Sequence, residues 1–164
     1  MSDCGAFEAK YKDLTPNSKP EDAQPLMEAL KEVNQMRLLN SNVQKLAEDQ
    51  AAAARKNGLL ISHFAFNGGE SQATILQREG KLAAIELKHA DGNSETLRYD
   101  IYSTDQGAKP TSDTINIACP GKPITSNFDF DNKGNFTKNY VTLPNNLEIE
   151  ADATGKVTHI RKSF

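Results

Sequence analysis

The chain has 164 residues, of which 37% are hydrophobic and 25% are charged, and its 19 basic and 22 acidic side chains give a net charge of −3. This length fits one domain. The basic residues are scattered among acidic ones, which argues against the concentrated cationic surface that nucleic acid requires. No apolar run approaches the roughly 18 residues that span a bilayer, so we predict no membrane span and no nucleic-acid partner.

The first predicted element is a short N-terminal helix. Cys4, Phe7, Tyr11 and Leu14 recur every three or four residues, which places them on one face of a helix. The turn-forming residues 15–20, which include two prolines, end this helix and form a linker.

A long helical segment is predicted over residues 23–57, with Asn57 and Gly58 as its C-terminal stop. Its apolar side chains recur every three or four residues and form one stripe: Leu26, Leu30, Val33, Met36, Leu39, Val43, Leu46 and Ala47. Asn40, Ser41 and Asn42 are poor helix formers, so a helical hairpin is an alternative. One long or kinked helix is favoured because no Gly or Pro interrupts it.

After Gly58 the apolar period changes from 3.6 to 2, which indicates strands. Residues 59–66 are apolar on both faces, a pattern typical of a strand in the centre of a sheet. Further strands are predicted at residues 71–78, 81–89, 95–103, 114–119, 124–131, 135–143, 147–152 and 156–163. Most of their connections are tight turns, too short for a parallel crossover, and residues 104–113 form a longer loop. The strands therefore make an antiparallel meander of about nine strands.

These elements predict an α+β fold in a single domain over residues 1–164. Residues 1–20 form a short helix and linker, 21–58 a long helical segment, and 59–164 an antiparallel sheet. Several strands alternate polar and apolar residues, and the helical stripe is the available cover for the apolar face. A sheet of so many antiparallel strands is expected to curve strongly, into a half-barrel around the helix.

The two cysteines, Cys4 and Cys119, are 115 positions apart, and a disulfide between them is favoured. Two alternatives remain: both are free thiols, or Cys4 is the lipid-bearing first residue of a bacterial lipoprotein. Neither cysteine has a histidine nearby in sequence, which argues against a catalytic thiol. A disulfide favours an extracytoplasmic protein of the periplasm, cell envelope or secreted fraction, whose export signal is absent from this chain.

Two segments, beginning at Asp131 and Asp152, share the pattern Asp-x-x-Gly-x-(apolar)-Thr. Their turn resembles that of YD-repeat proteins, but two copies do not make an array. We interpret both as hairpin turns that Asp opens and Gly completes in the left-handed conformation. The first also begins like a calcium loop at Asp129. It has Lys133 and Tyr140 at the fifth and twelfth positions, where such a loop needs oxygen ligands.

Candidate catalytic and metal-binding residues are few. Three histidines lie in different predicted strands without ligand-like spacing: His63, His89 and His159. Acidic strips on polar strand faces are expected to be solvated rather than paired for acid–base catalysis: Asp129, Asp131, Glu148, Glu150 and Asp152. No nucleotide-binding or hydrolase motif is present, so we predict no catalytic residue, no metal and no cofactor.

The sequence therefore predicts a non-catalytic exported or cell-envelope binding protein of unknown ligand, acting through the sheet face or the long helix. One alternative is a carrier of an apolar small molecule or lipid held between the curved sheet and the helix; another is a hydrolase without a recognisable motif. The partner is accordingly a protein or an apolar small molecule. Eight residues are expected to line the carrier's cavity: Phe64, Phe66, Ile85, Leu97, Tyr99, Ile101, Phe128 and Phe130.

Overall fold

A computed structural model describes residues 4–35, 42–58, 61–66, 69–78, 81–89, 92–100, 110–133 and 135–163. The helices are α1 (Cys4–Tyr11), the short 3₁₀ helix η1 (Pro20–Ala23), α2 (Gln24–Gln35) and α3 (Asn42–Lys56). The strands are β1 (Ile61–Phe66), β2 (Ser71–Arg78), β3 (Lys81–His89), β4 (Ser94–Tyr99), β5 (Pro110–Ile117), β6 (Ile124–Phe130), β7 (Phe136–Thr142), β8 (Leu147–Asp152) and β9 (Val157–Lys162).

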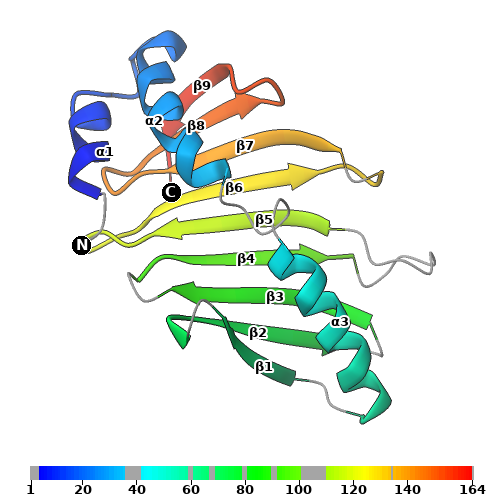
Figure 1. The fold of residues 1–164 in the computed structure, drawn as a ribbon. Coiled ribbons are helices and arrows are strands. Elements are labelled where there is room, and N and C mark those ends of the chain that lie inside the picture. The colour runs from blue at the N-terminus through cyan, green and yellow to red at the C-terminus, as the bar shows by residue number, and fades with distance from the viewer. Residues whose placement is uncertain are drawn as a thin grey trace.

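The nine strands form one antiparallel sheet in the order β1 to β9, with every strand beside its sequence neighbour (Figure 1). The predicted α+β fold with an antiparallel meander is therefore confirmed. The sheet is open, with β1 and β9 at opposite edges, and its half-barrel curvature stays a prediction.

Helices α2 and α3 lie on the same face of this sheet but over different parts of it (Figure 1). Helix α3 contacts β1, β2 and β3, whereas α1 packs against α2, and η1 packs against β9. The buried apolar residues accordingly form two clusters. Cluster 1 joins α1, η1 and α2 to strands β5 to β9, and cluster 2 joins α3 to strands β2 to β4.

Alanines form the buried face of α3. Ala47, Ala51 and Ala54 are at most 5% exposed, and their spacing of four and three residues puts them on one side of the helix. Small side chains let the helix approach the sheet closely. Leu46, which the sequence placed in the buried stripe, is 45% exposed. That prediction is wrong because Leu46 points about 100° away from its neighbour Ala47 around the helix.

The predicted long helical segment contains two helices in the described residues, α2 and α3. Leu26 and Leu30 of the predicted stripe are fully buried on α2. Residues 36–41, which include most of the predicted break, lie outside the described part of the chain. The side chains of Val33, Met36, Leu39 and Val43 also lie outside it.

Two strand predictions are wrong. Strand β5 begins at Pro110, not at residue 114, because proline lacks only the N–H and is tolerated as the first residue of a strand. Strand β1 was predicted to be central, yet it lies at an edge. The first strand of an open meander lies at an edge, so chain connectivity overrides the apolar composition of this strand.

The two predicted Asp turns are hairpin turns. The Asp152 carboxylate accepts hydrogen bonds from the backbone N–H groups of Thr154 and Lys156, at 2.9 and 3.1 Å, and Gly155 has φ +89°. Asp131 accepts the equivalent pair of backbone N–H groups, both at 2.9 Å. These carboxylates therefore order the β8–β9 and β6–β7 turns.

The Asp152 turn predicts a pH-dependent stability. The side-chain hydrogen bond from Thr154 lowers the pKa of Asp152 below its ordinary value. Desolvation opposes this shift, and the backbone N–H groups of Thr154 and Lys156 add to it. The stabilisation is therefore complete above the ordinary pKa and is lost as the pH falls through the lowered one. We expect Asp152→Asn to lower the melting temperature near neutral pH, with the difference from wild type vanishing in acid.

The control for this prediction is Asp13→Asn, which removes an exposed carboxylate outside the sheet and changes the net charge equally. Thermal unfolding of the three proteins across the acidic range tests it. If Asp152→Asn lowered the melting temperature by the same amount at every pH, the charge of this carboxylate would contribute nothing to stability.

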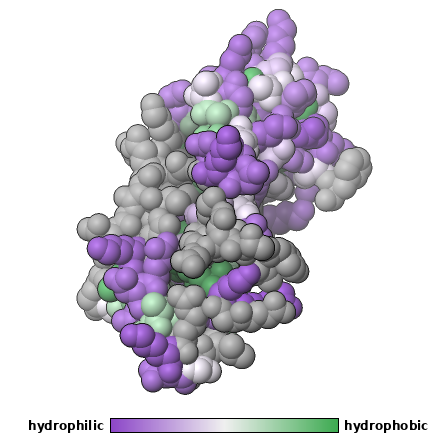
Figure 2. Space-filling model, turned by 90° about the vertical axis from the view of Figure 1, so that its right-hand side faces the viewer, coloured by the Kyte–Doolittle hydropathy of each residue, from purple (hydrophilic) through white to green (hydrophobic). Residues whose placement is uncertain are grey.

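The described surface residues are mainly polar on the side shown in Figure 2, where hydrophilic side chains predominate among the coloured atoms and a few hydrophobic ones are visible in the lower half. Among the described residues, the large exposed hydrophobic side chains are Leu46 and Ile61, at 45% and 56% exposure. No helix in the described ranges is long and apolar enough to cross a membrane.

Candidate functional site

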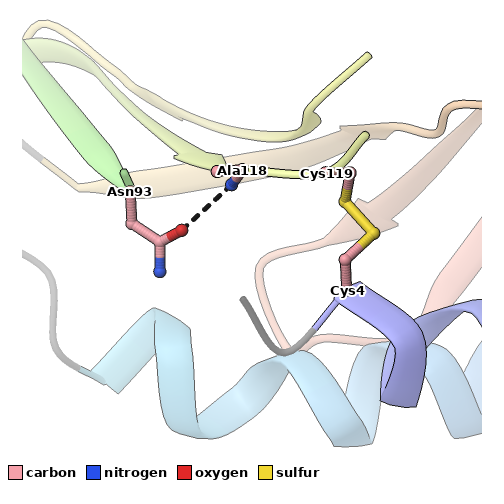
Figure 3. The surroundings of a disulfide bond; sticks show 4 residues. All are labelled: Cys4, Asn93, Ala118 and Cys119. Atoms are coloured by element: carbon pink, nitrogen blue, oxygen red, sulfur yellow. Dashed lines mark hydrogen bonds between the residues drawn. A yellow bond between two sulfur atoms is a disulfide. The ribbon is translucent and has the colours of Figure 1, made fainter. Parts of the chain in front are cut away.

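A disulfide joins Cys4 at the start of α1 to Cys119, just after β5, with a Cα–Cα distance of 5.4 Å (Figure 3). This confirms the favoured pairing. Both sulfur atoms are consumed by the bond, so neither residue is a free thiol, and Cys4 cannot carry a thioether-linked lipid in this form of the protein. Residue Cys4 is buried, at 6% exposure, within cluster 1.

The β3–β4 turn holds the segment that leads to Cys119. The side-chain Oδ1 of Asn93 accepts a hydrogen bond from the backbone N–H of Ala118 at 2.9 Å (Figure 3). Gly92 in the same turn has φ +89°, and a Cβ built on it would lie 3.2 Å from the Cβ of Ala118. This close approach needs glycine and fixes the chain immediately before the disulfide.

The six proposed cavity-lining residues whose side chains are described do not gather at one place. Ile85, Leu97 and Tyr99 are buried in cluster 2, and Phe64 packs against them. Phe128 is buried in cluster 1, where Phe130 packs partly buried. The side chain of Phe66 and the whole of Ile101 lie outside the described residues. The predicted lining is thus divided between two clusters, and the carrier hypothesis stays a prediction.

The three histidines are separated. His63 in β1 and His159 in β9 occupy opposite edge strands. His89 in β3 pairs across strands with Ser71, whose Oγ lies 2.9 Å from its Nδ1. This Ser–His pair resembles the nucleophile and base of a hydrolase in residue type only, because Ser71 is 4% exposed and is not accessible to a substrate.

The acidic strip on β8 is neutralised by its neighbours. Glu150 accepts a hydrogen bond from Arg161 at 2.6 Å, lies 3.4 Å from His159 and 4.0 Å from Lys138. Partial desolvation raises the pKa of Glu150, but the Arg161 hydrogen bond and the nearby positive charges lower it below 4.5. Glu150 is therefore a charged member of an ion-pair network rather than a proton donor at neutral pH.

Cross-strand pairing arranges the face of the sheet opposite the helices, here called the open face, into rows. The longest row crosses all nine strands through His63, Thr74, Glu86, Thr96, Thr114, Asn127, Tyr140, Glu150 and His159. A parallel row runs through Ala65, Gln72, Lys88, Ser94, Asn116, Thr125, Thr142, Glu148 and Arg161. With strands about 4.8 Å apart, such a row is about 38 Å long.

The centre of the open face is an array of uncharged hydroxyl and amide side chains on three adjacent strands. This central polar array consists of Ser94 and Thr96 on β4, Thr114 and Asn116 on β5, and Thr125 and Asn127 on β6. Its members hydrogen-bond one another: Thr114 donates to Asn127 at 2.6 Å, and Thr125 donates to Asn116 at 2.8 Å. The sequence showed the alternation of polar residues in these strands, but not the register that brings them together.

Two acidic residues are buried on the opposite, helix-covered face. Asp113 is fully buried on β5, between Leu97 of cluster 2 and Phe128 of cluster 1 on the flanking strands. Glu95 on β4 is 4% exposed. Asp113 was missed because the sequence placed it in a loop, and it lies where the two apolar clusters meet.

Among the described residues, no three histidine, cysteine, aspartate or glutamate side chains are close enough to hold a metal ion. The geometry thus offers one extended, preordered polar surface and no deep constellation of reactive groups within those ranges. A scan against protein-family models and a search of curated proteins both found no match to this chain.

Proposed function

We propose that this protein is a non-catalytic binding protein of an extracytoplasmic compartment, and that the central polar array is the middle of its contact surface for a protein partner. The observation that carries the proposal is the placement of α2 and α3 on one face of the sheet. That placement leaves the array on the other face.

Preorganisation supports a binding role for the array. Thr114, Asn116, Thr125 and Asn127 already hold one another by hydrogen bonds, and Asn127 also donates to Asp129 at 2.8 Å. Fixed side chains lose less conformational entropy when a partner binds. Because the array itself carries no charge, its partner surface is expected to be polar and uncharged at the centre.

The disulfide supports the proposed extracytoplasmic location. Such bonds persist in oxidising environments and are rare in the cytosol of mesophiles. The Cys4–Cys119 bond links α1 to the sheet, so a reducing compartment would loosen the cover of cluster 1.

The open face also explains why we favour binding over catalysis. His159 lies 3.4 Å from the Glu150 carboxylate, and the His159 side chain is 63% exposed on an edge strand. Acid–base catalysis gains from a site that excludes water and positions the substrate. An exposed edge strand provides neither.

Site-specific photocrosslinking in the native host tests this proposal. A photoreactive amino acid at Thr96 or Thr114 should give an adduct of defined mass, because both side chains lie in the array. The matched control carries the same group at Ala52, an exposed position on α3. Adducts from Ala52 but not from the two sheet positions would contradict the proposal, as would adducts of the same mass from all three.

A further inference from the structure

The two edges of the sheet differ in how they are protected. At the β9 edge, the Gln24 side chain accepts a hydrogen bond from the Val157 backbone N–H at 3.1 Å and donates one to the Gly155 carbonyl at 3.0 Å. The strand also carries Arg161 and Lys162. Charged side chains and a covering element are the usual means by which proteins prevent further strands from pairing at an edge.

Among the described residues, the β1 edge carries no charged Lys, Arg, Asp or Glu side chain, and no strand is seen on its outer side. Its six residues, Ile61–Phe66, include no lysine, arginine, aspartate, glutamate, proline or glycine. Ile61 is the most exposed large hydrophobic residue described, at 56%, and Ala65 is also exposed. In the described part of the chain, β1 has a strand beside it on one side only, which is β2.

The composition of β1 is that of a strand with neighbours on both sides. Residues 59–66 are apolar on both faces, which is why the sequence predicts a central strand. In this chain alone, the position is an edge. A further strand on the side of β1 away from β2 would give β1 the central position that its composition predicts.

We propose that this strand is β1 of a second copy of the chain, paired antiparallel about a two-fold axis. Because β1 has no lysine, arginine, aspartate or glutamate, pairing it with itself places none of these charges opposite one another, so β1 is compatible with self-pairing. The helix α3 packs against β1 and holds it in place before pairing. The proposal goes beyond the proposed function, because it uses the edge of the sheet and not the central polar array.

The geometry of antiparallel pairing restricts the register. Cross-strand partners must share a face, and Ile61, His63 and Ala65 share the open face because they pair with the same face of β2. The two-fold axis therefore passes between one β1 residue and the same residue of the second copy. If that residue is His63, Ile61 lies opposite Ala65 of the second copy, and the exposed isoleucine is covered.

The expected dimer is weak. Six residues in a strand give a contact only about 20 Å long. The area buried by such a contact is small compared with that of most specific protein interfaces. We therefore expect a concentration-dependent dimer rather than an obligate one.

Sedimentation velocity of the disulfide-intact full chain, from micromolar to near-millimolar concentration, tests the proposal. Wild type should dimerise, and Ile61→Lys should raise the dimer dissociation constant at least about tenfold, since it introduces a charge at the edge. The matched control is Leu46→Lys on α3, which makes the same kind of change at a side chain 45% exposed and should leave the constant unchanged. Urea unfolding of both variants verifies that they are folded.

A cysteine at the two-fold axis tests the register. Under mild oxidation, His63→Cys should form a covalent dimer, whereas Thr74→Cys on β2, in the same row, should not. A wild type that stays monomeric at all concentrations would overturn the proposal. So would a dimer that Leu46→Lys weakens as much as Ile61→Lys, or one in which Thr74→Cys cross-links and His63→Cys does not.

Discussion

Replacing both Cys4 and Cys119 with serine should lower the free energy of unfolding by about 4–5 kcal/mol, because the disulfide spans 115 positions and restricts the unfolded chain. The chain-entropy model gives one of its larger values for a loop of this length. Loss of the disulfide also removes the covalent link that holds α1 against the sheet. The α1 residues Phe7 and Tyr11 are buried in cluster 1 together with Cys4. Urea unfolding of the variant and of oxidised wild type measures the difference.

Reduced wild type is the control for this prediction. It keeps both cysteines and lacks only the bond, so its stability should match that of the serine variant. It should also gain the mass of two hydrogen atoms. A loss below about 1 kcal/mol would contradict the prediction and show that the unfolded chain retains structure without the cross-link.

Truncating a central isoleucine in either cluster should cost about 2–5 kcal/mol, since a buried side chain leaves a cavity behind. Ile85 of cluster 2 and Ile149 of cluster 1 are both fully buried. Although the two residues lie in different clusters, we expect the chain to unfold in a single cooperative transition. Ile85→Ala and Ile149→Ala should both shift this same transition. The reason is that β4 pairs with β5 along its whole length, with one register shift between Arg98 and Tyr99, and so joins the two halves of the sheet.

The matched control is Ile61→Ala, which removes the same atoms from a side chain 56% exposed and should change stability far less. Tyrosine fluorescence can follow the two clusters, because Tyr11 lies in cluster 1 and Tyr99 in cluster 2. Two separate transitions, with each variant shifting only one of them, would contradict the prediction of a single domain.

The errors of the sequence analysis share a physical origin. Residue type and period report which environment a segment prefers, whereas its position depends on the chain that precedes and follows it. The apolar β1 segment prefers two neighbouring strands, but as the first strand of a meander it lies at an edge. Leu46 and Ala47 were both placed in the stripe, but Ala47 is buried together with Ala51 and Ala54, whereas Leu46 is exposed.

The sequence by itself determined what depends on local interactions. The turn-forming Asp and Gly residues position the β6–β7 and β8–β9 hairpins, and short connections require antiparallel pairing. These signals predicted the meander, and cysteine number predicted the disulfide that the structure contains.

Only the tertiary structure decided what depends on contacts between distant residues. The register brings Thr114 beside Asn127, and a shift by one residue would send each of these side chains to the opposite face. The placement of α2 and α3 on one face determined which surface remained for the central polar array. The same placement divided the predicted cavity residues between two clusters, because each helix covers only the strands beneath it.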